Sequence, residues 1–317
     1  MNVFVSHQSA LEYWRTCLAL PPAGASRRYR GALPGNPPTN EQVRLSELKL
    51  PLHIILGKAG TRWASTIMKQ HVFTGKAPEG SFIRIDNKFF VSSPEFCFLQ
   101  MANVLPLAGL IRLGYELCGT YSKPAPGTSN VPERGFHNRE PLTSKKKIEA
   151  FVNRMPGFKG RLSALRALRY ILDGSASPME TNLAMFLTLP YMLGGFGFDQ
   201  PELNKRITLS KNARKYFDKS YYVCDLFWEN EQIAVEYDSD QHHTGSERIA
   251  SDSNRRNALG LAGIRVVSIT KHQLYSSLEL EGAARTIAGH MQKRLFSKKS
   301  NFYERHYELR RQLLDVD

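Results

Sequence analysis

Two acidic residues in the C-terminal half, Asp225 and Glu236, have the types and spacing that could bind a metal ion. Both lie in segments that alternate apolar and polar residues, which predicts two strands joined by a turn centred on Asn230 and Glu231. In that hairpin Asp225 lies opposite Glu236, and opposed residues of antiparallel strands have Cβ atoms about 5 Å apart. Two carboxylates this close repel each other unless a cation or a shared proton lies between them. The simplest arrangement is a divalent ion, Mg²⁺ or Mn²⁺, bound by both carboxylates.

A solvent-exposed hairpin is the alternative, because acidic residues commonly alternate with apolar ones on a half-exposed strand. Cys224, Leu226 and Trp228 argue against it, since they make the opposite face of the same strand apolar as well. A strand that is apolar on both faces is usually covered and central. The sequence therefore favours a covered hairpin in which the two acids form a site.

Glu180 and Asp238 are further candidates for this site. Glu180 ends the segment 177–180 (Ser-Pro-Met-Glu), which predicts a capped helix N-terminus with proline at the first helical position. Capping explains Glu180 by itself, and the helix face that carries it is also expected to turn toward the sheet. Asp238 shares a strand face with Glu236.

A loop histidine and a charged helix extend the candidate site. His243 follows the acidic strand in a loop, where a histidine is either solvated or a ligand. Asp252 and Arg256 have the spacing of a helical ion pair, and Ile249 and Leu259 on the same face predict that the pair points inward. Basic residues expected to track phosphates at the rim are Arg248, Arg255, Arg256, Lys271 and the run 298–311.

The elements that must position these residues follow in the order helix, three strands, helix, strand, helix. A helix opens at 177, and the later elements are strands at 204–210, 220–228 and 232–238, a helix at 246–262, a strand at 264–270 and a helix at 272–296. A three-strand meander followed by a right-handed crossover into a fourth strand predicts a four-stranded mixed sheet flanked by helices.

This region resembles a known family. The segments that carry the resemblance are VCDLFW (223–228), IAVEYDSDQHH (233–243) and RIASDSNRRNALGLAGIRVVSIT (248–270). They resemble the very-short-patch-repair endonuclease-like domains, a branch of the PD-(D/E)XK or restriction-endonuclease-like superfamily. The resemblance covers about residues 160–275 and implies the superfamily's αβββαβ core.

The resemblance also assigns roles to single residues. Asp225 matches the family's metal-binding aspartate, and Glu236 and Asp238 lie at the D/E-x-K half-motif. Asp238 stands where the superfamily usually has a lysine that helps to orient the attacking water. The other matches are Glu180 with the acid of the first core helix, His243 with a catalytic-site histidine and Asp252 with a polar helix residue near the site.

The function that the resemblance implies is a metal-dependent endonuclease that hydrolyses phosphodiester bonds, with DNA the expected nucleic acid and phage defence or DNA repair the expected setting. A non-catalytic, antitoxin-like regulator that binds nucleic acid and retains the nuclease fold is the alternative. An interaction module with a protein partner in a defence system is a third reading. The charge, 43 Lys and Arg against 29 Asp and Glu, favours a polyanionic partner, nucleic acid first and a membrane surface second, with solubility alone as the plainer explanation.

Composition and length set the remaining expectations. Four cysteines without a CxxC pair favour a reducing compartment, and the N-terminus lacks the pattern of a signal peptide. The longest uncharged run, 181–198, is interrupted by Pro190 and glycines, so no membrane span is expected. These features predict a cytoplasmic protein.

The 317 residues are enough for two domains, and the Gly- and Pro-rich stretch 119–142 is the expected boundary. The expected parts are a smaller α+β domain at 1–118, a linker at 119–142, a nuclease-like domain at 143–296 and a basic helical extension at 297–317. The first part loosely resembles AbiEi-type abortive-infection antitoxins. Its expected elements are helices at 6–17, 94–101 and 105–118, a strand at 50–57 and a strand or hairpin at 82–91.

Overall fold

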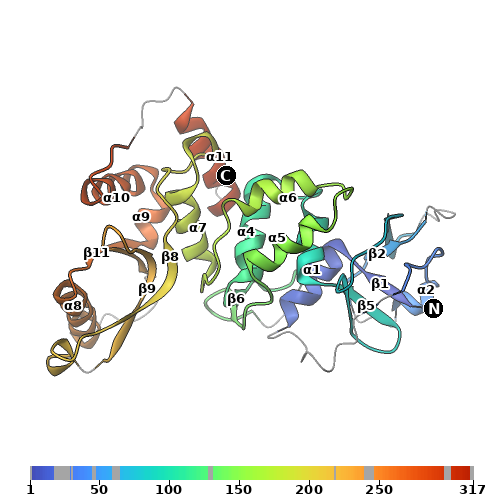
Figure 1. Ribbon diagram of the computed structural model, residues 1–317, viewed down its shortest axis with the longest axis horizontal. Coiled ribbons are helices and arrows are strands. Elements are labelled where there is room, and N and C mark those ends of the chain that lie inside the picture. The colour runs from blue at the N-terminus through green and yellow to red at the C-terminus, as the bar shows by residue number, and fades with distance from the viewer. Residues whose placement is uncertain are drawn as a thin grey trace. The chain divides into compact units, whose positions relative to one another are not determined.

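Two structural units divide the chain, Met1–Asp173 and Gly174–Asp317. The computed structural model describes residues 2–17, 29, 31–44, 48–58, 65–127, 131–217, 219–238, 246–295 and 301–314, and for 246–252 it describes the backbone alone. Figure 1 colours the first unit from blue to green and the second from yellow-green to red. Each unit combines helices with its own mixed sheet, so the predicted α+β class is confirmed.

The first unit contains a five-stranded sheet in the order β3-β2-β1-β5-β4. Its strands are β1 (Val3–Val5), β2 (Leu52–Leu56), β3 (Met68–Val72), β4 (Phe82–Arg84) and β5 (Phe89–Ser92). The central strand β1 pairs antiparallel with β2 and parallel with β5, and all three of its residues are buried. The expected strand at 50–57 and hairpin at 82–91 are confirmed, whereas β1 and β3 are too short or too polar to be predicted from periodicity.

Helices cover this sheet and form the rest of the first unit. They are α1 (His7–Thr16), α2 (Asn40–Arg44), α3 (Pro94–Met101), α4 (Leu107–Cys118), α5 (Lys145–Asn153) and α6 (Arg161–Leu168), with a small pair of strands β6 (Tyr121–Ser122) and β7 (His137–Asn138). Helix α1 packs on β2 and α3, α5 packs on α3, and α6 packs on α4. The helices expected at 6–17, 94–101 and 105–118 correspond to α1, α3 and α4.

The domain boundary lies later than the sequence suggested. The expected linker 119–142 belongs to the first unit, because the Arg139 guanidinium is buried and donates to the carbonyl oxygens of Trp14 and Glu116 at 2.8 and 2.6 Å. The segment 143–173 belongs there too, since α5 and α6 pack on α3 and α4. The first unit is therefore the larger one, and the described residues of this stretch, 119–127 and 131–142, belong to a domain.

The second unit contains the predicted four-stranded mixed sheet, in the order β11-β10-β9-β8. Its strands are β8 (Glu202–Thr208), β9 (Tyr221–Trp228), β10 (Ile233–Asp238) and β11 (Arg265–Thr270). The pairs β8–β9 and β9–β10 are antiparallel, and β10–β11 is parallel. The element order from α7 to β11 is helix, three strands, helix, strand, as the periodicity predicts.

The helices of the second unit are α7 (Pro178–Thr188), α8 (Ser246–Leu261), α9 (Lys271–Tyr275), α10 (Ser277–His290) and α11 (Phe302–Leu314), with 3-10 turns η1 (Tyr191–Leu193) and η2 (Ala213–Lys215). The single helix expected at 272–296 is two helices, because Thr270 forms a capping box for α9 and Ser276 then caps α10. Within the described part of the chain, no helix is both long enough and apolar enough to cross a membrane.

Helix α7 lies at the centre of the second unit. Every residue from Thr181 to Thr188 is buried, because α7 packs on β9 and β10 and also on α11. The Asn182 side-chain amide donates to the Leu313 carbonyl oxygen at 3.0 Å, which joins α7 to α11. The expected C-terminal extension is thus part of this core, and Figure 1 shows the sheet between α7 and α8.

Candidate active site

The hairpin of β9 and β10 places Asp225 and Glu236 side by side on neighbouring strands. The register pairs Ile233 with Trp228 and Val235 with Leu226, and one further step sets Glu236 opposite Asp225. The strands join through the turn centred on Asn230 and Glu231, which closes with a hydrogen bond from the Gln232 N–H to the Glu229 carbonyl oxygen. The predicted turn and strand pairing are confirmed.

The Asp225 carboxylate is tied to the neighbouring strand. Its Oδ2 accepts a hydrogen bond from the Tyr237 N–H at 2.8 Å, where a regular ladder would use a carbonyl oxygen. Burial, and then the charges of Glu180 and Glu236, raise the pKa of Asp225 from 3.8 to about 8. The carboxyl groups of Glu180 on α7 and Glu236 on β10 are thus close enough to oppose the ionisation of Asp225 on β9.

Glu236 forms an ion pair with an arginine side chain of helix α8. Its Oε2 forms an ion pair with the Arg255 guanidinium, which also donates to the Val223 carbonyl oxygen. The Glu236 side chain is only 12% exposed, and burial raises its pKa although Arg255 opposes the increase. Its second oxygen, Oε1, is buried and has no hydrogen-bond partner within the described part of the protein. A buried carboxylate oxygen of this kind can accept a further donor or bind a cation.

Glu180 and the strand residue Asn204 connect α7 to the sheet. Ser177 caps α7 by accepting from the Glu180 N–H at 3.1 Å, as the sequence predicts. The Glu180 Oε2 accepts from the Ala176 N–H at 3.0 Å and from the Asn204 side-chain amide at 2.8 Å. Glu180 therefore has the structural role of a cap, and its charge also acts on Asp225.

The other predicted site residues are distributed around this cluster. Asp238 ends β10, where it pairs in register with Thr270 of β11, so the exposed Lys271 lies at the same edge of the sheet. The expected inward position of Arg256 is wrong, because Arg256 is exposed and its neighbour Arg255 turns inward to Glu236. Arg255 is in consequence an ion-pair partner of the acids rather than a residue of the outer rim.

Three predicted residues receive no side-chain description. His243 lies outside the described residues, and Arg248 and Asp252 lie on α8 within 246–252, where the backbone alone is described. Among the residues that the structure describes, no group of three or more His, Cys, Asp or Glu side chains is arranged to hold a metal ion. The donor chemistry of the cluster nevertheless fits a hard cation, since carboxylate oxygens are the ligands that Mg²⁺ prefers and Glu236 Oε1 lacks a partner.

Comparisons with protein-family models, with curated proteins and with solved structures found no match.

Two residues of the cluster were missed by the sequence analysis. Asn204 falls opposite Asp225, because its neighbours Leu203 and Lys205 pair with Leu226 and Cys224. Its backbone has a φ of 49°, which asparagine tolerates better than most residues. Cys224 contacts Glu236, and burial together with that charge raises the pKa of the thiol to about 12. Asn204 could be placed only once the register of β8 against β9 was known.

Proposed function

We propose that the second unit is a metal-dependent nuclease domain that hydrolyses phosphodiester bonds in nucleic acid, DNA before RNA. The observation that carries the proposal is the buried Asp225 carboxyl, held between Glu180 and Glu236 with its pKa raised to about 8. A structural acid is normally paired, whereas an acid held beside like charges is typical of a functional site. The helix, three-strand, helix, strand order of this unit supports the restriction-endonuclease-like core.

The charge balance of the cluster suits one divalent cation. When ionised, the carboxylates of Glu180, Asp225 and Glu236 carry three negative charges against one positive charge on Arg255, which leaves a formal charge of −2. A bound Mg²⁺ would cancel this charge, polarise a phosphate oxygen and lower the pKa of a coordinated water. Asp225 and Glu236 are the residues that would hold it.

The protein's own groups have distinct tasks in this proposal. The Tyr237 N–H fixes the direction of the Asp225 carboxylate, and Arg255 binds one oxygen of Glu236, while the other is buried and accepts no hydrogen bond from the described residues. Lys271, exposed at the edge of the sheet where β10 and β11 end, is placed to attract a phosphate. Asp238 lies at that edge as a further acid for positioning water.

A non-catalytic nucleic-acid-binding regulator is the second candidate, favoured by a specific observation. Arg255 already neutralises part of the acid cluster, and Asp238 rather than lysine follows Glu236. An ion pair can replace a metal ion as the partner of a buried acid, so the same fold would remain stable without catalysis. In that case the positive net charge would serve binding alone.

Cleavage of supercoiled plasmid DNA and of single-stranded RNA by the full chain tests the first proposal. The wild type should cut in Mg²⁺ or Mn²⁺ and not in EDTA, and Asp225→Asn should lose at least about a hundredfold in rate, because it removes a metal ligand. Glu229→Gln, which removes an exposed carboxylate from the same hairpin, is the matched control and should retain activity. Metal-independent cutting, or equal rates in both variants, would contradict the proposal. Binding of DNA without cutting in any metal favours the regulator.

A further inference from the structure

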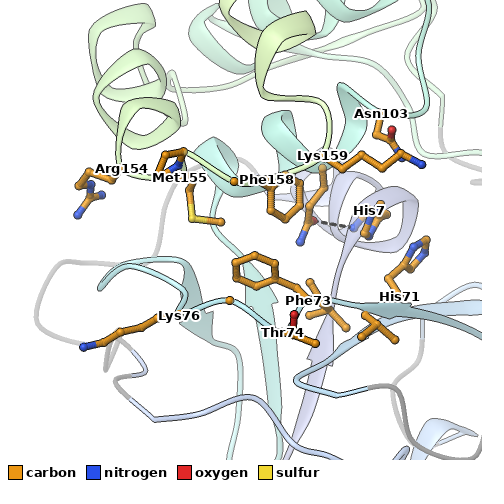
Figure 2. A pocket seen from close by; sticks show the side chains of 16 residues that line it. His7, His71, Phe73, Thr74, Lys76, Asn103, Arg154, Met155, Phe158 and Lys159 are labelled. Atoms are coloured by element: carbon orange, nitrogen blue, oxygen red, sulfur yellow. Dashed lines mark hydrogen bonds between the residues drawn. The ribbon is translucent and has the colours of Figure 1, made fainter.

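A second candidate site lies wholly in the first unit, in a cavity of about 570 Å³. Small-molecule sites usually occupy clefts of about 300–1,000 Å³ with apolar walls and a few placed polar groups. The cavity is lined by the start of α1, the end of β3 with its following loop, and the loop between α5 and α6. Figure 2 shows Phe73 and Phe158 next to each other, with Lys76 and Arg154 on one side of them and His7 and His71 on the other.

Two phenylalanines form the apolar wall. The ring centroids of Phe73 and Phe158 are 5.2 Å apart, and Phe158 also packs edge-on against the buried Phe96 at 5.4 Å. Phe73 and Phe158 are both only half-buried, so part of each ring is open to the cavity. Exposed ring faces on a fixed support are a stacking surface for a planar aromatic group.

Histidines form the polar wall. The rings of His7 and His71 stack at 3.5 Å with an angle of 13° between their planes, and His71 Nε2 contacts His53 Nδ1 at 3.1 Å. Burial, and then the neighbouring histidines, lower the pKa of His7 to about 3, and burial and His53 lower that of His71 to about 4. Stacked neutral rings direct their nitrogens in parallel rather than toward one ion, so His7 and His71, the two histidines that line the cavity, suit hydrogen bonding to a ligand rather than metal binding.

The backbone at His7 is strained and held in place. His7 has a φ of 49°, a conformation rarely adopted by residues other than glycine. Its N–H donates to the Gln100 Oε1 at 2.9 Å, its Nδ1 contacts the Ser6 Oγ at 3.0 Å, and its carbonyl oxygen accepts from the Cys97 thiol. Strain that is maintained by several specific contacts is concentrated at functional sites, because it fixes a side chain in one direction.

The mouth of the cavity is basic. Lys76, Arg154 and Lys159 line the cavity and are exposed, Lys76 and Arg154 on the side away from the histidines and Lys159 closer to His7 (Figure 2), and among the described lining residues none is acidic. Since the histidines are neutral at physiological pH, these three side chains give the opening its charge. An anionic group would bind at this end, and the remainder of the ligand would extend between the phenylalanine and histidine walls.

We propose that this cavity binds a nucleotide, with the phosphate at Lys76 and Arg154, the base against Phe73 and Phe158, and His7 and His71 as hydrogen-bonding partners. The nucleotide is either a free mononucleotide or the terminal unit of a single strand, which share this chemistry. The cavity is separate from the acid cluster of the second unit, so the inference stands whether or not that unit is a nuclease.

Binding of AMP to the full chain in EDTA tests the proposal, with adenosine, inorganic phosphate and a phosphorylated single-stranded hexanucleotide as comparison probes. Isothermal titration calorimetry should detect binding of AMP or of the hexanucleotide. The probe that binds more tightly shows whether the ligand is a free mononucleotide or the terminal unit of a single strand. Adenosine and phosphate should each bind at least about tenfold more weakly, because each lacks one half of the recognised chemistry.

Variants locate the site. Lys76→Gln and Arg154→Gln should each raise the Kd for the tighter probe about tenfold, since each removes a charged hydrogen bond to phosphate. Lys88→Gln removes an exposed lysine of the same unit outside the cavity and should leave the Kd unchanged. Absence of binding by AMP and by the hexanucleotide at millimolar concentration overturns the proposal. Equal weakening by Lys88→Gln, or phosphate alone binding as tightly as AMP, overturns it as well.

Discussion

The Asp225→Asn variant should be more stable than the wild type in metal-free buffer at pH 8. In the wild type, burial and the charges of Glu180 and Glu236 raise the folded-state pKa of Asp225 from 3.8 to about 8. Asparagine removes the ionisable group and keeps an oxygen that can accept from the Tyr237 N–H. The substitution therefore removes the repulsion while it retains the hydrogen bond.

The pH window follows from the direction of this shift. Between pH 3.8 and about 8 the folded protein keeps a proton on Asp225 that the unfolded chain releases, so the free energy of unfolding falls as pH rises through this window. Within this window the free energy of unfolding falls by at most about 1.4 kcal/mol for each pH unit. Because residual water around the carboxyl screens its charge, we expect a total cost of about 2–4 kcal/mol at pH 8, absent below about pH 4.

Urea denaturation in EDTA between about pH 4 and about pH 9 measures this difference directly. The curves of wild type and Asp225→Asn should coincide at the acidic end and separate as pH rises, whereas Glu229→Gln should follow the wild type throughout. Adding Mg²⁺ should stabilise the wild type and stabilise the variant much less. A variant that is less stable than wild type at pH 8, together with a wild type that does not respond to Mg²⁺, would refute the reasoning.

Three other predictions concern the same unit and the thiols. Arg255→Gln should destabilise the protein by about 2–4 kcal/mol in urea denaturation, because it strands the buried Glu236 charge, and Glu236→Gln in addition should restore much of the loss; no restoration contradicts the ion pair. Asn204→Ala should lower the free energy of unfolding by about 2–3 kcal/mol, because alanine tolerates the positive φ poorly and the hydrogen bond to Glu180 is lost. Asn204→Gly should lower it less, since glycine adopts this φ freely; equal losses would argue against backbone strain. A thiol reagent at pH 8 should modify Cys17 in the native protein and all four cysteines after unfolding, because Cys17 is only half-buried and the other three thiols are buried; native modification of a second thiol contradicts this.

The sheet of the second unit could be predicted because local and long-range signals agree there. Alternation sets which residues of β9 and β10 share a face, and the short turn at Asn230 and Glu231 fixes the register, so the Asp225–Glu236 pairing follows. The first unit carried weaker signals. Its central strand β1 has three residues and its strand β3 is polar, so neither shows a detectable period.

The domain boundary could not be predicted, because composition does not report tertiary packing. Residues 119–142 are rich in glycine and proline, yet Arg139 within them is buried between carbonyl oxygens of the first unit. Similarly, periodicity continues across Ser276, where capping hydrogen bonds divide the expected helix into α9 and α10. The first error arises from contacts between residues distant in sequence, and the second from capping hydrogen bonds that periodicity does not report.

The inward-facing arginine of α8 was misplaced by one residue for a geometric reason. Ala258 and Leu259 are fully buried, and Arg255 precedes them by three and four positions, which puts it over the same strip of the helix. Arg256 lies about 100° further round and reaches solvent. In the sequence, Ile249 and Leu259 indicate only roughly which face of α8 is buried. The residues that are actually packed show where the middle of that face lies.

This correction bears on how the acid cluster could work. The lysine of the resembling superfamily is absent, and Asp238 stands in its place, but a positive charge still reaches Glu236 from α8 through Arg255. Arginine keeps its proton at all physiological pH values, so Arg255 can orient a carboxylate or a water but cannot take a proton from it. In a nuclease built on this cluster, Arg255 could therefore hold the acids but not accept the proton of the attacking water. Substituting lysine for Arg255 would exchange a fixed two-pronged donor for a flexible point charge, so it would not reproduce the lysine that the resemblance leads us to expect after Glu236.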